Sequence, residues 1–136
     1  MPAGEFSLPI RVYIEDTDAG GIVYYVNYLK YMERSRTELM RSAGFDKKYI
    51  FNEALMFVVR SVAITYLKPA TLDDELLATA RISQMKGASM TLWQSVTLAG
   101  DILAQGEVSI VCVDKASMKP RRMPAAMREK LLAVQQ

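Results

Sequence analysis

The sequence predicts an α+β fold in which one long central helix packs against a mostly antiparallel, five-stranded sheet. Near the start of the chain, apolar and polar side chains alternate with a period of two, which is typical of a strand with one buried face. A segment with helical periodicity follows. After it come four strand-like segments that are joined largely by tight turns, and this order favours antiparallel neighbours.

The first part of the chain contains one expected strand and the long helix. The strand covers residues 6–14, and a loop at 16–21 with two adjacent glycines interrupts it, so a turn or a close ligand approach is expected there. The helix extends from about Tyr24 to a stop at Gly44, because apolar residues recur every three to four positions. Asn27 is a candidate N-cap, unless the helix begins a few residues earlier.

The remaining strands are expected at residues 57–67, 76–85, 90–98 and 102–113. Tight turns are expected at Lys86-Gly87 and Gly100-Asp101. Gly106 interrupts the last strand and suggests a bulge there. Shorter helices are expected at 47–54 and 125–134. Apolar and aromatic groups remain on the outer face of the sheet, which favours dimerisation.

Composition indicates an ordinary single domain spanning residues 1–136. Hydrophobic residues make up 51% and charged residues 24%, and the net charge of +2 is too small to indicate nucleic-acid binding. No apolar run is long enough for a transmembrane helix, and the first residues lack the pattern of a signal peptide. The single cysteine, Cys112, cannot form an internal disulfide. We therefore expect a cytoplasmic protein.

The sequence contains no histidine. This excludes a Ser-His-Asp or Cys-His mechanism within the chain and removes the commonest zinc ligand, so neither a metal nor a cofactor is predicted. Acid–base chemistry must therefore use carboxylates, tyrosine, lysine, cysteine or backbone groups.

The loop before the long helix carries the sequence DTDAGGIVYYVNY at residues 16–28. This segment resembles the active-site signature of hotdog-fold thioesterases of the 4-hydroxybenzoyl-CoA thioesterase type. Over residues 8–124 the chain is similar to the acyl-CoA thioesterases associated with the Tol-Pal genes. That wider similarity rests on RVYIEDTDAGG at 11–21, YMERSRTE at 31–38, LDD at 72–74, VCVD at 111–114 and MKPR at 118–121.

The resemblance implies a hotdog fold, in which a curved sheet wraps the long helix, and a homodimer or a dimer of dimers with active sites at the subunit interface. It implies hydrolysis of acyl-CoA thioesters, with acyl carrier protein as an alternative donor. Asp18 corresponds to the catalytic carboxylate, as nucleophile or general base, and the backbone amide of Tyr25 to the group that polarises the carbonyl. One departure is Tyr25 itself, because the Tol-Pal-associated enzymes usually have histidine there whereas the 4-hydroxybenzoyl type has tyrosine.

The remaining candidates would bind substrate. Basic groups are expected near the phosphates of coenzyme A, and Lys86 with Gly87 and Ser89 matches the hairpin that contacts the nucleotide in related enzymes. The other candidates are Gly21, Val23 and Asn27 beside the motif, and the weaker basic candidates Arg60, Lys119, Arg121 and Arg122.

Several alternatives stay open. Glu33 is a rival catalytic carboxylate on the helix, although it is expected to pair with Arg34, Arg36 or Thr37, and Asp16 is expected to be structural. A non-catalytic acyl-thioester-binding or scaffold protein is the second candidate function. A hotdog dehydratase acting on acyl carrier protein is the third, and such enzymes generally rely on a histidine. Aromatic, short-chain and long-chain acyl groups are all compatible with the sequence.

Overall fold

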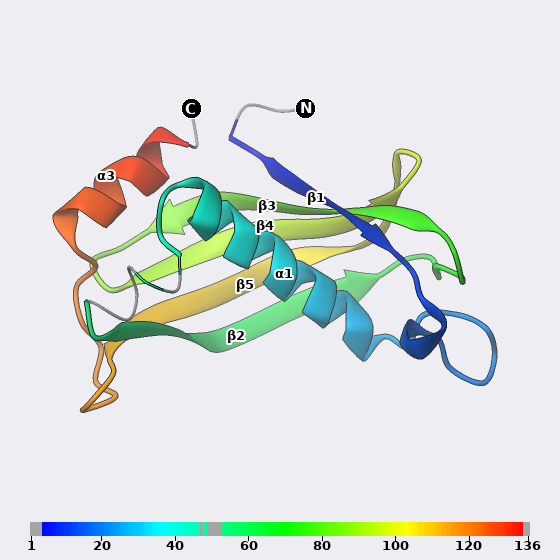
Figure 1. Ribbon diagram of the computed structural model, residues 1–136, viewed down its shortest axis with the longest axis horizontal. Coiled ribbons are helices and arrows are strands. Elements are labelled where there is room, and N and C mark those ends of the chain that lie inside the picture. Colours follow the sequence, from blue (N-terminus) through cyan, green and yellow to red (C-terminus); the bar gives the residue numbers. More distant parts are fainter. Residues whose placement is uncertain (1–3, 47, 49–52, 135–136) are drawn as a thin grey trace.

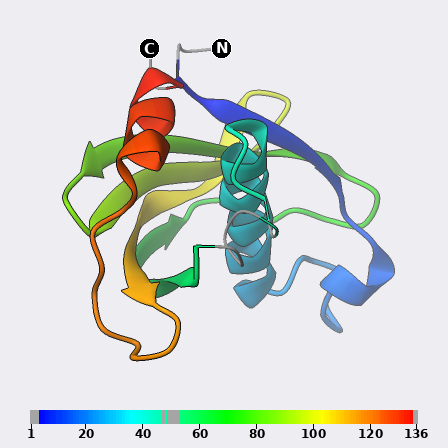
Figure 2. The ribbon, with the colours of Figure 1, turned by 60° about the vertical axis from the view of Figure 1, so that its left-hand side comes forward.

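Five antiparallel strands form one sheet in the order β1-β3-β4-β5-β2. The computed structural model describes residues 4–46, 48 and 53–134. The strands curve around the long helix α1, which lies across the inner face of the sheet (Figures 1 and 2). In chain order the elements are β1 (Phe6–Arg11), the 3-10 helix η1 (Ile14–Asp16), α1 (Val26–Ser42), β2 (Leu55–Tyr66), β3 (Glu75–Met85), β4 (Ser89–Leu98), β5 (Asp101–Asp114) and α3 (Ala125–Ala133).

The α+β architecture and the long central helix expected from the sequence are confirmed. The first strand is shorter than expected, because the chain leaves the sheet after Arg11 and turns into η1. Helix α1 begins before Asn27, and its N-cap residue Tyr25 makes no side-chain capping hydrogen bond. The short helix expected at 47–54 falls mainly on residues 47 and 49–52, which lie outside the described residues.

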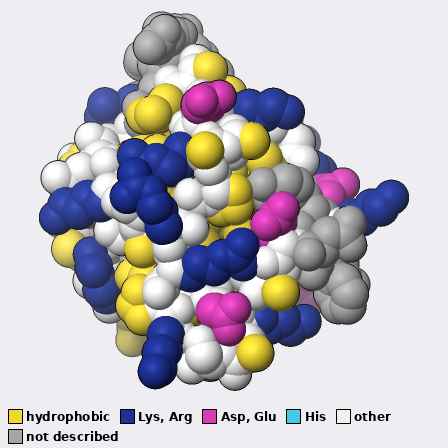
Figure 3. Space-filling view, turned by 90° about the vertical axis from the view of Figure 1, so that its left-hand side faces the viewer, with side chains coloured by type: hydrophobic (Ala, Val, Ile, Leu, Met, Phe, Trp, Pro, Cys, Tyr) yellow, Lys and Arg dark blue, Asp and Glu magenta, His cyan; other side chains and the backbone are white. Residues whose placement is uncertain are grey.

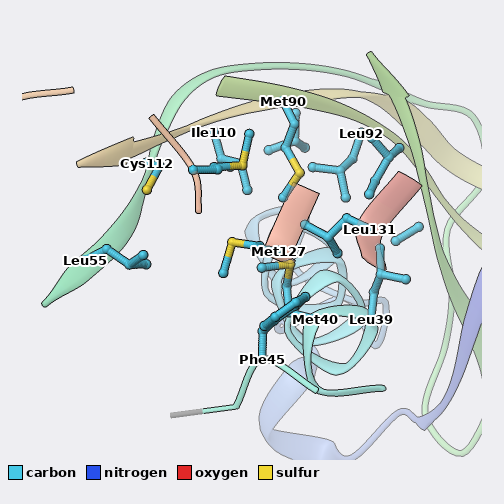
Figure 4. Close-up of a cluster of buried hydrophobic side chains, with 14 residues drawn as sticks. Leu39, Met40, Phe45, Leu55, Met90, Leu92, Ile110, Cys112, Met127 and Leu131 are labelled. Atoms are coloured by element: carbon cyan, nitrogen blue, oxygen red, sulfur yellow. The ribbon is translucent and has the colours of Figure 1, made fainter. Parts of the chain in front are cut away.

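The inner face of the sheet and α1 enclose two groups of buried side chains. One lies at the α3 end, where Met127 and Leu131 of α3 meet Leu39 and Met40 of α1 and the residues of β4 and β5 beneath them (Figure 4). The second, which includes Tyr28, Tyr31 and Met32, lies toward η1. Each fully buried Leu or Met side chain contributes roughly 1.5–3 kcal/mol relative to exposure. This packing fixes α1 on the sheet, and with it the position of the loop before the helix.

Strand β2 forms one edge of the sheet, and among the described strands it pairs with β5 alone. Most of its residues are exposed, including Val59, Val62 and Tyr66. An edge strand with unpaired backbone groups and exposed apolar side chains is a template for pairing with another chain.

Among the described residues, no helix is long and apolar enough to cross a membrane.

Candidate active site

The loop that joins β1 to α1 lies at the end of the sheet opposite α3 (Figure 1). Its first part is tied to the β2–β3 connection, since the Val12 amide donates to the Asp74 carbonyl at 2.9 Å. Its second part is tied to the same connection by the Val23 amide, which donates to the Ala70 carbonyl at 2.8 Å. A bridge between Thr17 and Val23 closes the loop on itself. The motif is therefore held as a compact turn at the N-terminus of α1.

Asp16 connects the two ends of this loop. Its Oδ2 accepts a hydrogen bond from the Tyr13 amide at 2.9 Å, and its Oδ1 accepts one from Nδ2 of Asn27 at 3.0 Å. Its carbonyl accepts a third from the Tyr24 amide at 2.9 Å. Asp16 is only 8% exposed, so it holds the start of α1 against η1 as a structural residue. Asn27 is equally buried, and its amide serves this contact.

Tyr31 lies beneath Asp16. Its side chain is fully buried, and its hydroxyl has no hydrogen-bond partner among the described residues. Burial raises the pKa of Tyr31, and the nearby Asp16 carboxylate raises it further. The hydroxyl therefore stays protonated and places no second negative charge under the loop.

Asp18 is exposed at the tip of the loop. Its Oδ1 accepts a hydrogen bond from the Gly20 amide at 2.8 Å, which fixes the carboxylate in an Asx turn. Its carbonyl accepts the Gly21 amide at 3.1 Å, and Gly21 has a φ of +82°, a conformation that favours glycine. Within the described part of the chain, Oδ2 has no partner, so one carboxylate oxygen is free to meet a ligand.

Tyr25 is the N-cap residue of α1, and its amide donates to no acceptor within the described residues. Unpaired amides and the helix dipole together give a helix N-terminus roughly half a positive charge, which suits a developing oxyanion. Tyr25 is 58% exposed, and its ring lies edge-on to that of Tyr66, with centroids 5.8 Å apart. Tyr66 also contacts Tyr28 at 5.6 Å, so the end of β2 supports the start of α1. No local pattern in the sequence indicates this role of Tyr66.

The structure does not bring the hairpin candidates close to Asp18 within the chain. Strand β3 starts opposite Arg11, at the Asp18 end of the sheet, and ends at Met85 just before Lys86 and Gly87. Ten residue steps along a strand span about 33 Å. Ser89 lies just beyond the same hairpin, and Arg60 lies midway along β2, where Nη2 donates to Oγ of Ser109 at 3.1 Å.

The C-terminal segment wraps this hairpin. The Met123 amide donates to the Gly87 carbonyl at 2.9 Å, and the Arg128 guanidinium donates to the Lys86 carbonyl. The Arg122 guanidinium lies against Gly87. Figure 3 views the molecule from this end and shows Lys and Arg side chains spread over it. Arg128 thus joins the expected basic groups, whereas Arg121 is engaged with Glu53.

Two other candidate groups are less suited to the chemistry. Glu33 is exposed on α1 and, within the described residues, forms neither an ion pair within 4 Å nor a hydrogen bond. Burial lowers the pKa of Arg36, but the Glu33 carboxylate lies near enough to that guanidinium to raise its pKa in opposition. Glu33 lies eight residues after Tyr25, about 12 Å along the helix.

Cys112 is fully buried, and burial raises the pKa of its thiol. The described residues contain no group of acidic or cysteine side chains that could hold a metal ion.

Comparison with known proteins agrees with this fold. The thioesterase-like superfamily matches residues 12–131. The acyl-CoA thioester hydrolase YbgC of Escherichia coli O6:H1 is 42% identical over 123 residues, which cover 90% of this chain and 92% of that protein. The acyl-CoA thioesterase YbgC of Haemophilus influenzae is 41% identical over 124 residues, which cover 90% and 91%.

A solved structure extends the comparison to three dimensions. The crystal structure of a probable thioesterase from Bartonella henselae has a TM-score of 0.84 at 34% identity and covers 88% of this chain and 99% of its own. Family, relatives and structure therefore agree over nearly the whole chain. The chain belongs to the thioesterase-like superfamily, and its sheet curved around one long helix is the hotdog fold of that family.

Proposed function

We propose that this protein hydrolyses acyl-CoA thioesters to a free acid and coenzyme A at the junction of the loop and α1. The observation that carries the proposal is the arrangement of this junction. The exposed Asp18 carboxylate and the unpaired Tyr25 amide belong to one short, hydrogen-bonded turn at a helix N-terminus. A carboxylate beside a preorganised donor supplies the two functions that thioester hydrolysis needs.

The Tyr25 amide donates to the thioester oxygen as negative charge develops on it. One such donor contributes on the order of 3 kcal/mol in the transition state. Asp18 acts by one of two routes. As a general base it takes a proton from water, and the resulting hydroxide adds to the carbonyl. As a nucleophile it forms a mixed anhydride that water then hydrolyses. In both routes the C–S bond breaks, and the thiolate leaves and is protonated to the free thiol.

The complete site is proposed to form in a homodimer, with a dimer of dimers as the larger assembly. Antiparallel pairing of β2 with β2 of a second copy would give hydrogen-bond partners to the unpaired backbone groups at this edge. It would also cover the exposed side chains of Val59 and Val62. In that arrangement the two subunits run in opposite directions. The basic hairpin end of one subunit then approaches the Asp18 end of the other, which resolves the separation between Asp18 and Lys86 within one chain.

Lys86→Ala is expected to raise KM for acyl-CoA about tenfold and to change kcat little. One charge-assisted phosphate contact contributes roughly 1.5 kcal/mol, and this contact is present equally in the ground and transition states. Steady-state kinetics with a single acyl-CoA measures both constants. Lys48→Ala serves as the matched control for loss of one lysine. An unchanged KM in Lys86→Ala would remove the hairpin from the coenzyme A site.

Thiol release from a panel of thioesters tests the proposed function. The panel combines aromatic, short-chain and long-chain acyl-CoAs with acyl carrier protein thioesters. The same experiment therefore determines the preferred acyl class and whether coenzyme A or acyl carrier protein carries it. Turnover of acyl-CoA supports the proposal. Binding without turnover of any member would favour the non-catalytic acyl-thioester-binding function instead.

The free, buried Cys112 accords with a reducing compartment, and we propose the cytoplasm as the place of action.

A further inference from the structure

Tyr31 carries a buried hydroxyl that has no hydrogen-bond partner in the described part of the chain. The residue is fully buried among apolar side chains of the group toward η1, which includes Val12 and Met32. Buried hydroxyls in proteins nearly always have a partner, because an unpaired one loses its bonds to water and gains nothing in return. An unpaired hydroxyl at this depth, directly under the candidate site, therefore calls for an explanation.

Asp16 is the acceptor that this hydroxyl can reach. Nδ2 of Asn27 donates to Oδ1 of Asp16 at 3.0 Å, and Asn27 is four residues before Tyr31 in α1. Residues four apart share one helix face, and helical side chains lean toward the N-terminus, so Tyr31 points toward the same carboxylate. Burial raises the pKa of Tyr31, and the charge of Asp16 raises it further, which also places the two groups close together. The Arg34 guanidinium, 5.9 Å from the centre of the Tyr31 ring, has no acceptor to offer.

The Asp16 carboxylate has room for a third hydrogen bond. Its two oxygens can accept about four bonds. Among the described residues, Oδ1 accepts one from Asn27 and Oδ2 accepts one from the Tyr13 amide. Asp16 is 8% exposed, so water has little access to the remaining lone pairs. A hydroxyl that donates to a carboxylate forms a strong, charge-assisted bond, and such a bond would fix the side chain of Asp16 more firmly.

Asp16 holds both halves of the proposed catalytic turn. It is two residues before Asp18, and its carbonyl accepts the Tyr24 amide at 2.9 Å, directly before Tyr25. Its side chain holds Asn27, two residues after Tyr25. A displacement of Asp16 therefore moves the Asp18 carboxylate and the Tyr25 amide relative to each other. A misplacement of 1 Å between reacting groups slows catalysis about a hundredfold.

We propose that the Tyr31 hydroxyl donates a hydrogen bond to the Asp16 carboxylate during turnover and thereby positions the catalytic turn. Hydrogen bonds at active sites are often long or poorly aligned in the free enzyme and tighten in the complex with substrate. Tyr31 is fully buried beneath the loop, so it is a positioning residue and not a catalytic one. Its effect on turnover rests on the proposed function, whereas the hydrogen bond itself does not.

Tyr31→Phe removes the hydroxyl and keeps the ring, so the packing around α1 is retained. It is expected to lower kcat for acyl-CoA about tenfold, because loss of one hydrogen bond displaces the turn by less than about 1 Å. KM should stay within about twofold, since the bond acts on alignment rather than on the binding of coenzyme A. Steady-state kinetics with one acyl-CoA measures both constants, and circular dichroism checks folding. An unchanged kcat in the folded variant would overturn the inference.

Tyr13→Phe and Tyr28→Phe are the matched controls. Tyr13 is exposed on the same loop and donates to Asp16 through its backbone amide, which the variant keeps, so kcat within about twofold of wild type is expected. Tyr28 is buried on the same helix, and its hydroxyl accepts the Ala70 amide at 2.9 Å. Its loss leaves that amide unpaired, so the midpoint of urea unfolding should fall while kcat changes less than in Tyr31→Phe. An equal fall in kcat in Tyr28→Phe would overturn the specific role of Tyr31.

The hydrogen bond is also tested without turnover. A buried, hydrogen-bonded hydroxyl exchanges its proton slowly with water, so a downfield NMR signal is expected in the wild type and not in Tyr31→Phe. The signal should show a nuclear Overhauser contact with the Nδ2 protons of Asn27. In Asp16→Asn it should move upfield, because an amide oxygen accepts more weakly than a carboxylate. Where Asp16→Asn does not fold, the downfield position and the contact with Asn27 decide.

The two kinds of failure are distinguishable. A missing signal, or one that stays in place in folded Asp16→Asn, would overturn the inference and leave the proposed function intact. A wild-type protein that hydrolyses no thioester would overturn the proposed function, and with it the role of Tyr31 in turnover, while the NMR signal still decides whether Tyr31 and Asp16 are bonded.

Discussion

Replacing Asp18 by asparagine is expected to lower kcat for acyl-CoA hydrolysis by about 10³-fold, since general acid–base catalysis contributes roughly 10²–10⁴. Asparagine keeps the size of the side chain and an Oδ1 that accepts the Gly20 amide, so the turn is retained. It cannot take a proton from water or form an anhydride. The loss should therefore appear in kcat, with little change in KM or in the free energy of unfolding. Thiol release under saturating substrate measures it.

Two further variants make this experiment decisive. Glu15→Gln removes a carboxylate from the same loop, and Glu15 is exposed, so activity within about twofold of wild type is expected. Glu33→Gln tests the rival carboxylate on α1. If Asp18→Asn kept near-normal turnover while dimeric Glu33→Gln lost it, the catalytic carboxylate would be on the helix and the present assignment would be wrong.

Gly106→Ala is expected to destabilise the fold by more than about 3 kcal/mol, or to prevent accumulation of folded protein. A Cβ at this position would lie 1.9 Å from the Ala63 carbonyl oxygen and 2.8 Å from Cα of Ile64. Both are backbone atoms of β2, so relief requires separation of β2 from β5 rather than rotation of a side chain. Urea denaturation followed by circular dichroism measures the change in the free energy of unfolding.

Gly87→Ala is the control for this prediction. Its Cβ would meet Nη1 of Arg122 at 3.1 Å, and the end of a flexible side chain can move. A cost below about 1 kcal/mol is therefore expected. A Gly106→Ala protein as stable as wild type would show that β2 and β5 can separate locally, and that their close approach does not constrain the sheet.

The α+β architecture and the place of the candidate site loop before α1 could be predicted from the sequence alone. Alternation with a period of two and recurrence every three to four residues depend on side chains close together in the chain, so strands and α1 can be predicted from neighbours alone. The motif at 16–28 is equally local, and the resemblance assigned Asp18 and Tyr25 from it. The role expected of Asp16 also followed, because an aspartate in a glycine-containing loop bonds nearby backbone amides.

How residues far apart in the chain meet became known from the three-dimensional structure. Gly106 was expected to mark a bulge, but its register with Ile64 and Gln94 is regular, and the glycine is needed for close approach to β2. Glu33 was expected to pair within its helix, and it lies near Arg36 without a direct ion pair, where it lines a groove beside α1. Asp18 and Lys86 proved to lie at opposite ends of the sheet. Each of these outcomes depends on which strands are neighbours and in which direction they run, and the spacing of residues along a chain does not encode either.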